Sequence, residues 1–325
     1  GLSALAGALA MTSAHAGALS VSGSMEVSYT KGSNETTSNP LGQATDITLA
    51  ASTELDNGVT VAYKNTSSDT TLTGDSELVF GNILGGTLAM TSTGSPVSAI
   101  DNKTPTAWKD ANDQAGSITD VNGSDGTFGI RYTLSDVGGS GVKLDYMYFP
   151  VHGTGDGVGD EGFSGGGHGN KDAHEITLTG AVPGIEGLNI GAGYYNGNYD
   201  LAAASEQDKH EGTAYATYAY GPITVGYQVG GVGAQGSNPT GYKNTYAGIS
   251  YAISDDLSIS YSNIESRKTN QSGSGDATEQ DLDSISLSYS MGGMTINVVD
   301  ADCSNCSYTA NKSQNERALT LAIAF

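Results

Sequence analysis

The residues best suited to do chemistry are the charged side chains of one long polar segment, which runs from Thr91 to Gly126. They are Asp101, Lys103, Lys109, Asp110, Asp113, Asp120 and Asp125. The first six are the candidates for a charged constriction. Carboxylates outnumber ammonium groups here, and such a cluster of fixed charges attracts small cations. Irregular segments of this length usually have a function or are disordered. An ordinary solvated surface loop is the alternative, and the elements that hold the segment must decide between the two.

Basic residues are scarce, with 13 Lys and Arg against 35 Asp and Glu and a net charge of −22. This balance argues against nucleic acid as a partner, because phosphate binding needs a basic surface. Lys64, Arg131 and Lys143 fall on the small, polar face of segments that alternate like strands. Their expected roles are compatible. They neutralise nearby acids such as Glu54 and Asp145, and they form the positive side of a transverse field opposite the acidic segment.

A second polar segment, residues 151–173, is acidic and rich in glycine. Asp156, Asp160 and Glu161 supply carboxylate oxygens of the kind that calcium prefers. Their spacing matches neither the EF-hand nor a clean RTX repeat, so we expect a solvated acidic vestibule, with calcium at these three residues as the alternative. Three histidines in or beside the segment are weaker candidates for zinc: His152, His168 and His174.

The two cysteines, Cys303 and Cys306, form a C-x-x-C pattern in the last polar segment. In an exported chain we expect them to form a disulfide that closes the tip of a loop. Metal binding would need two more ligands from elsewhere.

Two further observations argue against an enzyme. Residues 231–236 formally match G-x-G-x-x-G, but loop and strand follow them instead of a helix, so they do not predict a dinucleotide site. The histidines after residue 16 lie in or beside loops, and no Ser/His/Asp set emerges.

Strands must position all of these residues, because apolar and polar residues alternate along most of the chain. The pattern is clear in LSVSGSMEVSYT (19–30), VTVAYK (59–64) and TFGIRYTL (127–134). Strict alternation over such lengths predicts strands with one apolar face. Glycine is abundant at 47 residues, which fits an all-β protein with many turns.

The connections between strands alternate between short and long. Seven are short, turn-type stretches such as Asp56-Asn57-Gly58. Eight are long and polar: 32–43, 66–75, 92–126, 151–173, 199–211, 232–241, 267–281 and 303–314. Fifteen connections predict about sixteen strands, each near the length that crosses a bilayer at a tilt. The even number places both ends of the chain on the side of the short turns.

Aromatic residues and the last strand point to a membrane. Tyrosines come late on strands that lead to long loops and also late on strands that return. Because these strands run in opposite directions, their ends lie at opposite rims, which predicts two aromatic belts. The final residues, ALTLAIAF, alternate strictly and end on Phe325. No stretch reaches the length of an apolar membrane helix, so a closed β-barrel is the expected way to span a membrane. The last strand should then pair with the first.

Residues 1–16 differ from the rest of the chain. They are small, apolar and nearly chargeless, and they end in Ala14-His15-Ala16. We expect the remnant of a secretory signal peptide here, with residues 17–325 as one exported domain. A short buried helix is the alternative.

With these features, the sequence resembles the general-diffusion porins of the Gram-negative outer membrane, in particular sixteen-stranded trimeric porins of the alphaproteobacterial kind. The resemblance covers residues 17–325. It is carried by GALSVSGSMEVSY, by the hairpin ELDNGVTVAY, by the long third loop, and by LTLAIAF with Phe325.

The resemblance implies an all-β transmembrane barrel with short periplasmic turns, long extracellular loops and a third loop folded into the lumen. It implies a homotrimer in outer-membrane lipid and lipopolysaccharide. It also implies that the barrel-assembly machinery recognises the terminal strand, which ends in Phe325. The expected function is passive diffusion of small hydrophilic solutes, with a mild preference for cations that the third loop sets. Within that loop, Trp108 is expected to be a packing anchor that fixes the loop. A secreted glycine-rich surface or adhesive protein without a pore is the alternative.

Overall fold

The computed structural model describes residues 17, 19–33, 39–68, 75–124, 126–152, 170–199, 208–233, 240–270 and 278–325. Over these residues the chain forms sixteen strands, as the alternation predicted. The strands are β1 (Ser20–Gly32), β2 (Leu41–Glu54), β3 (Thr60–Ser68), β4 (Asp75–Ile83), β5 (Gly86–Thr91), β6 (Gly129–Leu134), β7 (Val142–Phe149), β8 (Asn170–Ala181), β9 (Leu188–Tyr199), β10 (Lys209–Tyr220), β11 (Ile223–Gly233), β12 (Thr240–Ala252), β13 (Leu257–Asn270), β14 (Gln280–Met291), β15 (Met294–Ser304) and β16 (Ser313–Ala324).

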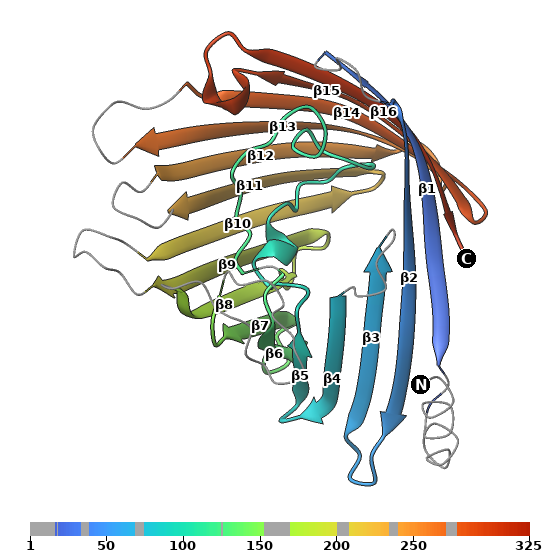
Figure 1. Cartoon of the computed structure of the whole chain (residues 1–325), viewed down its shortest axis with the longest axis vertical. Helices are drawn as coiled ribbons and strands as arrows, with labels where there is room; N and C mark the ends of the chain where they lie inside the picture. Colours follow the sequence, from blue (N-terminus) through green and yellow to red (C-terminus); the bar gives the residue numbers. More distant parts are fainter. Residues whose placement is uncertain are drawn as a thin grey trace.

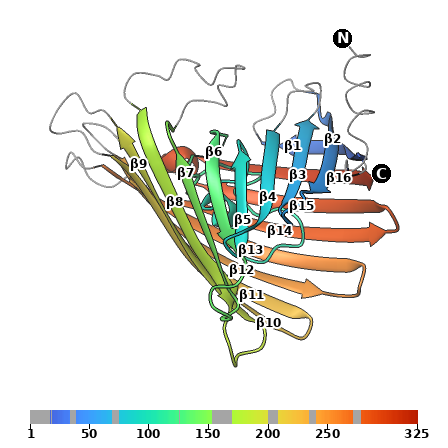
Figure 2. The same cartoon turned by 90° about the horizontal axis from the view of Figure 1, so that it is seen from below.

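The strands close into one antiparallel barrel (Figures 1 and 2). Each strand pairs with its neighbours in the sequence, and β16 pairs with β1. At the seam the backbone N–H of Gly23 donates to the carbonyl of Phe325 at 2.8 Å, and the N–H of Phe325 donates back at 2.9 Å. The prediction that the last strand pairs with the first is confirmed, and the pairing removes the open sheet edge.

The two faces of the barrel wall differ as the sequence pattern predicted. Val27 and Leu321 are paired directly across the seam, so they share a face, and both are exposed. The neighbouring pair Ser28 and Thr320 points to the other side. Large apolar residues therefore cover the outside, and small polar residues line the inside except where the wall packs against the segment between β5 and β6.

The positions of the aromatic residues agree with the prediction at the short-turn end of the barrel. They differ from it on the strands that lead to the long loops. Tyr220, Tyr251 and Phe325 lie at the short-turn ends of returning strands. On outgoing strands the predicted position near the strand end is wrong for Tyr63 and Tyr261, which lie early in β3 and β13. The physical reason is that backbone pairing continues beyond the aromatic residues, so the end of a strand does not mark the edge of the membrane.

The buried apolar residues lie inside the barrel, where the segment between β5 and β6 packs on the wall. We call this segment, residues 92–128, loop 3. One cluster places Ala111 and Ala115 of loop 3 against wall residues such as Ile264 and Leu282. A second cluster joins loop 3 to β7–β9 through these residues: Val97, Val121, Met147, Phe149, Ala173 and Tyr195. The core of this protein is thus the contact between loop 3 and the barrel.

Regular helix is limited to short 3-10 turns in the described part of the chain. They are η1 (Ser98–Ile100) in loop 3 and η2 (Cys306–Tyr308) after β15. Within that part, no helix has the length and apolar character needed to cross a membrane.

Candidate functional site

Loop 3 enters the barrel after β5 and follows the inner wall before it returns to β6 (Figure 1). Its backbone is hydrogen-bonded to inward-facing side chains of distant strands. The N–H of Ala107 donates to the hydroxyl of Ser260 on β13 at 2.8 Å, and the N–H of Trp108 donates to Ser286 on β14 at 3.2 Å. An irregular segment can remain inside the barrel because these wall groups satisfy its backbone.

Two buried carboxylates hold the ends of loop 3. Glu175 of β8 accepts hydrogen bonds from the hydroxyl of Ser95 at 2.6 Å, from the N–H of Val97 and from the N–H of Ser124. Glu211 of β10 accepts from the N–H groups of residues 122 and 123 at 2.7 and 2.6 Å. Hydrogen bonds to charged groups contribute about 1.5–3 kcal/mol each, so these two residues are strong anchors.

Buried amide side chains hold the middle of the loop. Gln228 of β11 accepts from the N–H of Lys103 at 2.7 Å and donates to the carbonyl of Ile100 at 2.9 Å. Asn244 of β12 donates to the carbonyl of Thr119 at 2.9 Å. Gln280 of β14 donates to the carbonyl of residue 117 at 3.1 Å. Each amide can donate and accept, which suits it to an irregular backbone.

Glycines in the wall let the loop approach closely. Gly226 and Gly248 are paired on neighbouring strands β11 and β12, and Pro105 of loop 3 lies on them. A Cβ atom at Gly226 would lie 2.5 Å from Cδ of Pro105, and one at Gly248 would lie 3.0 Å from its carbonyl oxygen. Only glycine therefore allows loop 3 to lie this close to the wall.

The predicted acidic residues of loop 3 divide into two kinds. Asp113 is exposed, and Asp101 and Asp120 are half-buried. Asp110 is buried, and its carboxylate accepts from the N–H groups of Asn112 and Asp113 at 2.9 and 3.1 Å. The structure thus corrects the expected position of Asp110, because its side chain shapes the turn of the loop instead of facing the lumen.

Burial raises the pKa of the three less exposed carboxyls. The pKa of Asp101 rises to about 7, with a further contribution from the nearby Asp120 carboxylate. Burial raises the pKa of Asp110 to about 6, and repulsion from Asp113 adds to it. Burial also raises the pKa of Asp120 to about 6. The fixed charge of loop 3 therefore depends on pH near neutrality.

The two lysines of loop 3 differ in their surroundings. Lys103 is exposed. The ammonium group of Lys109 lies 4.8 Å from the centre of the Trp108 ring, which itself packs against the apolar cluster around Ala111. The contact fits the expected packing role of Trp108 and places the Lys109 charge beside an aromatic face.

The predicted basic residues of the wall face the lumen by register, and two of them are paired. Arg131 bonds to Glu77 at 2.9 Å and donates to the carbonyl of Gly94 in loop 3 at 2.8 Å. Lys143 pairs with Asp145 at 2.7 Å. Lys64 is exposed and stands opposite Glu77 in the β3–β4 pairing. Arg131 therefore fixes the start of loop 3 as well as neutralising an acid.

The metal and disulfide candidates have different outcomes. Asp156, Asp160, Glu161 and His168 lie outside the described residues. His152 and His174 do not converge, because His152 contacts the carbonyl of Asn198 and His174 contacts Tyr146 and Asp172. Among the residues that the structure describes, no group of three or more His, Cys, Asp or Glu side chains is arranged for a metal. Cys303 and Cys306 are joined by a disulfide.

Sequence reasoning missed the anchors of loop 3. Glu175, Glu211 and Gln228 read as ordinary alternating polar positions, and Gly226 and Gly248 read as background in a glycine-rich chain. The available signal was weak: these are charged or amide residues within strands whose inner face is rich in Ser, Thr and Gly. Their role depends on which wall position the loop reaches, which local patterning does not contain.

A closed sixteen-stranded barrel with an inner loop and a charged lumen defines a membrane channel of the porin class. The profile of the Gram-negative porin family matches residues 1–302. This chain belongs to the Gram-negative porin family and is an outer-membrane β-barrel protein that forms a channel. The comparison with curated proteins gives no match.

Solved structures share the fold at low sequence identity. OmpT of Vibrio cholerae aligns with a TM-score of 0.68 and 8% identity, over 95% of this chain and 98% of that chain, and it has also been solved in a trimer form. A porin refined at 1.8 Å resolution aligns with a TM-score of 0.65 and 12% identity, over 95% and 100%. The anion-selective porin from Comamonas acidovorans aligns with a TM-score of 0.62 and 11% identity, over 95% and 99%.

Proposed function

We propose that this porin lets small hydrophilic solutes and ions diffuse passively through a pore that loop 3 narrows, with a mild preference for cations and no enzymatic activity. The observation that carries this proposal is the course of loop 3. The loop is fixed to the inner wall from β8 to β14, while Asp101, Asp113 and Asp120 remain at least partly exposed. Selectivity is decided where the passage is narrow, because charges farther away are screened over ~8 Å.

The preference is mild because positive charges lie on the same path. Lys103 on loop 3 and Lys64 on the wall are exposed and oppose the carboxylates. Arg131 and Lys143 contribute less, since each is paired with an acid. The net charge of −22 adds cation attraction at the pore mouths but is not concentrated at the constriction.

The assembly proposed for this chain is a homotrimer in outer-membrane lipid and lipopolysaccharide, inserted by the barrel-assembly machinery. The trimer form of OmpT supports the oligomeric state by analogy of fold alone. The family match favours this channel function over the alternative of a secreted adhesive protein.

Single-channel recording in planar bilayers tests the proposal. Stepwise conductance is expected, and the zero-current potential in a salt gradient should show mild cation preference. Asp113→Asn should shift that potential toward anions, because it removes an exposed carboxylate from the constriction. Asp255→Asn is the matched control: it removes an exposed carboxylate from the short turn after β12, away from loop 3, and should shift the potential much less. Equal shifts in the two variants would place the selectivity outside loop 3.

A further inference from the structure

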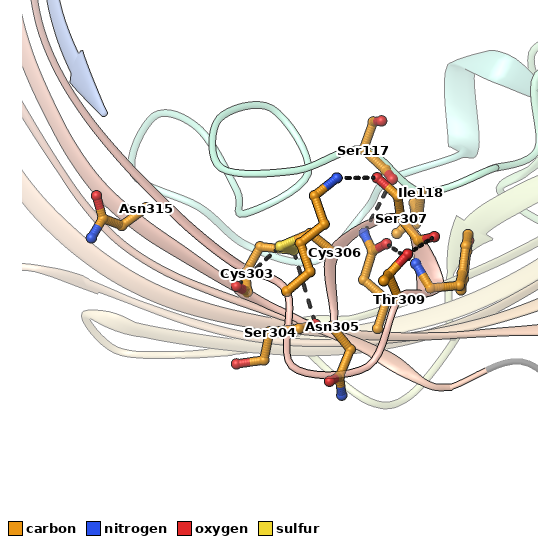
Figure 3. Close-up of a disulfide and its surroundings, with 12 residues drawn as sticks. Ser117, Ile118, Cys303, Ser304, Asn305, Cys306, Ser307, Thr309 and Asn315 are labelled. Atoms are coloured by element: carbon orange, nitrogen blue, oxygen red, sulfur yellow. Dashed lines mark hydrogen bonds between the residues drawn. A yellow bond between two sulfur atoms is a disulfide. The ribbon is translucent and has the colours of Figure 1, made fainter. Parts of the chain in front are cut away.

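The turn that follows β15 folds inward and meets loop 3. We call residues 303–308 the stapled turn, because the Cys303–Cys306 disulfide closes it. Both cysteines are 1% exposed, and they share one apolar cluster with Ala111 and Ala115 of loop 3. Figure 3 shows the disulfide beside Ser117 and Ile118 of loop 3. The match to the family covers residues 1–302 and does not include this turn.

The side chain of Cys303 lies close to the backbone of loop 3 at Gly116. A Cβ atom at Gly116 would lie 3.0 Å from the sulfur of Cys303 and 3.3 Å from its Cβ. The loop backbone therefore passes over the staple at a distance that no larger residue than glycine accepts without a shift. The staple forms part of the surface on which residues 111–116 lie.

Two polar connections extend this contact. In the first, the buried side chain of Gln280 donates to the carbonyl of Ser117 at 3.1 Å and accepts from the N–H of Tyr308 at 3.4 Å. In the second, the hydroxyl of Tyr308 lies 2.8 Å from the hydroxyl of Ser266. Ser266 donates to the side chain of Asn244 at 2.6 Å, and Asn244 in turn donates to the carbonyl of Thr119 in loop 3. One residue of the stapled turn thus reaches loop 3 by two routes.

The shape of the turn is one that its sequence alone would not hold. Asn305, Ser307 and Tyr308 adopt positive φ angles of 53°, 57° and 58°. Side chains disfavour this left-handed region, so surrounding structure must impose it. The disulfide links the two ends of the segment 303–306 and limits its alternatives, and the contacts of Tyr308 depend on that conformation.

The geometry points to the Cys303–Cys306 disulfide as a positioning element of the channel: it fixes the stapled turn, which holds residues 111–119 of loop 3 against the wall and so stabilises the pore cross-section. The inference rests on the proposed constriction by loop 3. Without the staple, loop 3 keeps its anchors at Glu175, Glu211 and Gln228, so the barrel still forms while the far part of the loop moves more freely.

The test compares wild type with the double variant Cys303→Ser/Cys306→Ser in planar bilayers. The double variant should show a severalfold rise in the variance of the open-channel current, because part of the constriction moves, while stepwise opening persists. Ser304→Ala is the matched control, since Ser304 is exposed within the same turn and its change leaves the disulfide in place. A double variant with the conductance and current variance of wild type would overturn the inference.

A second arm uses wild-type protein that has already assembled, and so remains informative if the double variant folds poorly. A dithiol reductant gives two electrons and two protons to the disulfide, which becomes two thiols, while the reductant becomes a cyclic disulfide. Current variance should rise in proportion to the thiol fraction measured by alkylation after denaturation. Reduced protein with unchanged variance would also overturn the inference. Failure of the proposed function would look different: wild type itself would show no stepwise conductance.

Discussion

Single carboxylates in loop 3 have different roles although they look alike in the sequence. Asp113 is exposed, whereas Asp110 is buried and accepts backbone hydrogen bonds within the loop. The same side chain thus has a structural role at position 110 and, in the proposed function, carries a pore charge at position 113. Glu175 and Glu211 show the structural role on the wall, where Glu175 accepts three and Glu211 accepts two hydrogen bonds from loop 3.

The raised pKa values make selectivity depend on pH. Because the pKa of Asp101 is about 7, instead of 3.8, its carboxyl is charged above that pH and becomes neutral below it. Asp120 follows at about 6. Cation preference should therefore fall as pH is lowered from 8 to 5, a range in which a carboxyl of ordinary pKa stays ionised.

Zero-current potentials measured across this pH range provide the check. In Asp101→Asn the part of the change centred near neutrality should disappear, while the remainder centred near pH 6 should persist. A wild-type profile that is flat between pH 8 and 5 would contradict the assignment of these acids to the conducting path.

At the scale of elements, the position of loop 3 depends on the inner face of the strands that carry it. The wall from β8 to β14 offers acceptors and donors at the places where the loop backbone needs them. Where the loop lies closest, at the Gly226–Gly248 pair, the wall offers no side chain at all. Glycine within a strand usually weakens the strand. Here Gly226 and Gly248 leave the space that Pro105 occupies, which we call the seat of Pro105.

Alanine at Gly226 should displace loop 3. Its Cβ would lie 2.5 Å from Pro105, so the loop must move off the wall into the lumen and lower the single-channel conductance. Overpacking of this kind costs about 1–3 kcal/mol, which should also lower the unfolding temperature. Gly230→Ala is the control on the same face of the same strand, because its Cβ would meet Val121 at an ordinary 3.5 Å. Equal conductance in the two variants would show that the seat does not set the position of the loop.

At the scale of the whole molecule, closure is completed by the last residue of this chain. Phe325 exchanges two backbone hydrogen bonds with Gly23. Its ring also covers that glycine, since a Cβ there would lie 2.8 Å from the ring. The side chain is 76% exposed on the outside of the barrel. It contributes little buried area within the chain, so its expected importance lies in assembly.

Phe325→Asp should reduce the amount of assembled protein in the outer membrane. Lipid exposure alone predicts a small effect, because charges near the membrane interfaces cost ~0–1 kcal/mol. Tyr220→Asp is the matched control, since Tyr220 is equally exposed, at 75%, and lies at the same end of the barrel. The prediction is a clear loss of heat-modifiable, folded barrel for Phe325→Asp and a nearly normal level for Tyr220→Asp. Similar levels of the two variants would refute a special role of the terminal residue.

The sequence by itself determined the barrel. Alternation with period two assigns every residue of a strand to one face, and short turns between long loops give the number and direction of strands, so closure of β16 on β1 follows. These are local properties or simple consequences of connectivity.

The tertiary structure decided what loop 3 does. Lys103 meets Gln228, which is 125 residues away, and Gln280 joins the loop to the stapled turn. Loop 3 has no period, so alternation does not separate the buried Asp110 from the exposed Asp113. The difference follows from the folded course of the loop, in which the Asp110 carboxylate accepts the N–H groups of Asn112 and Asp113.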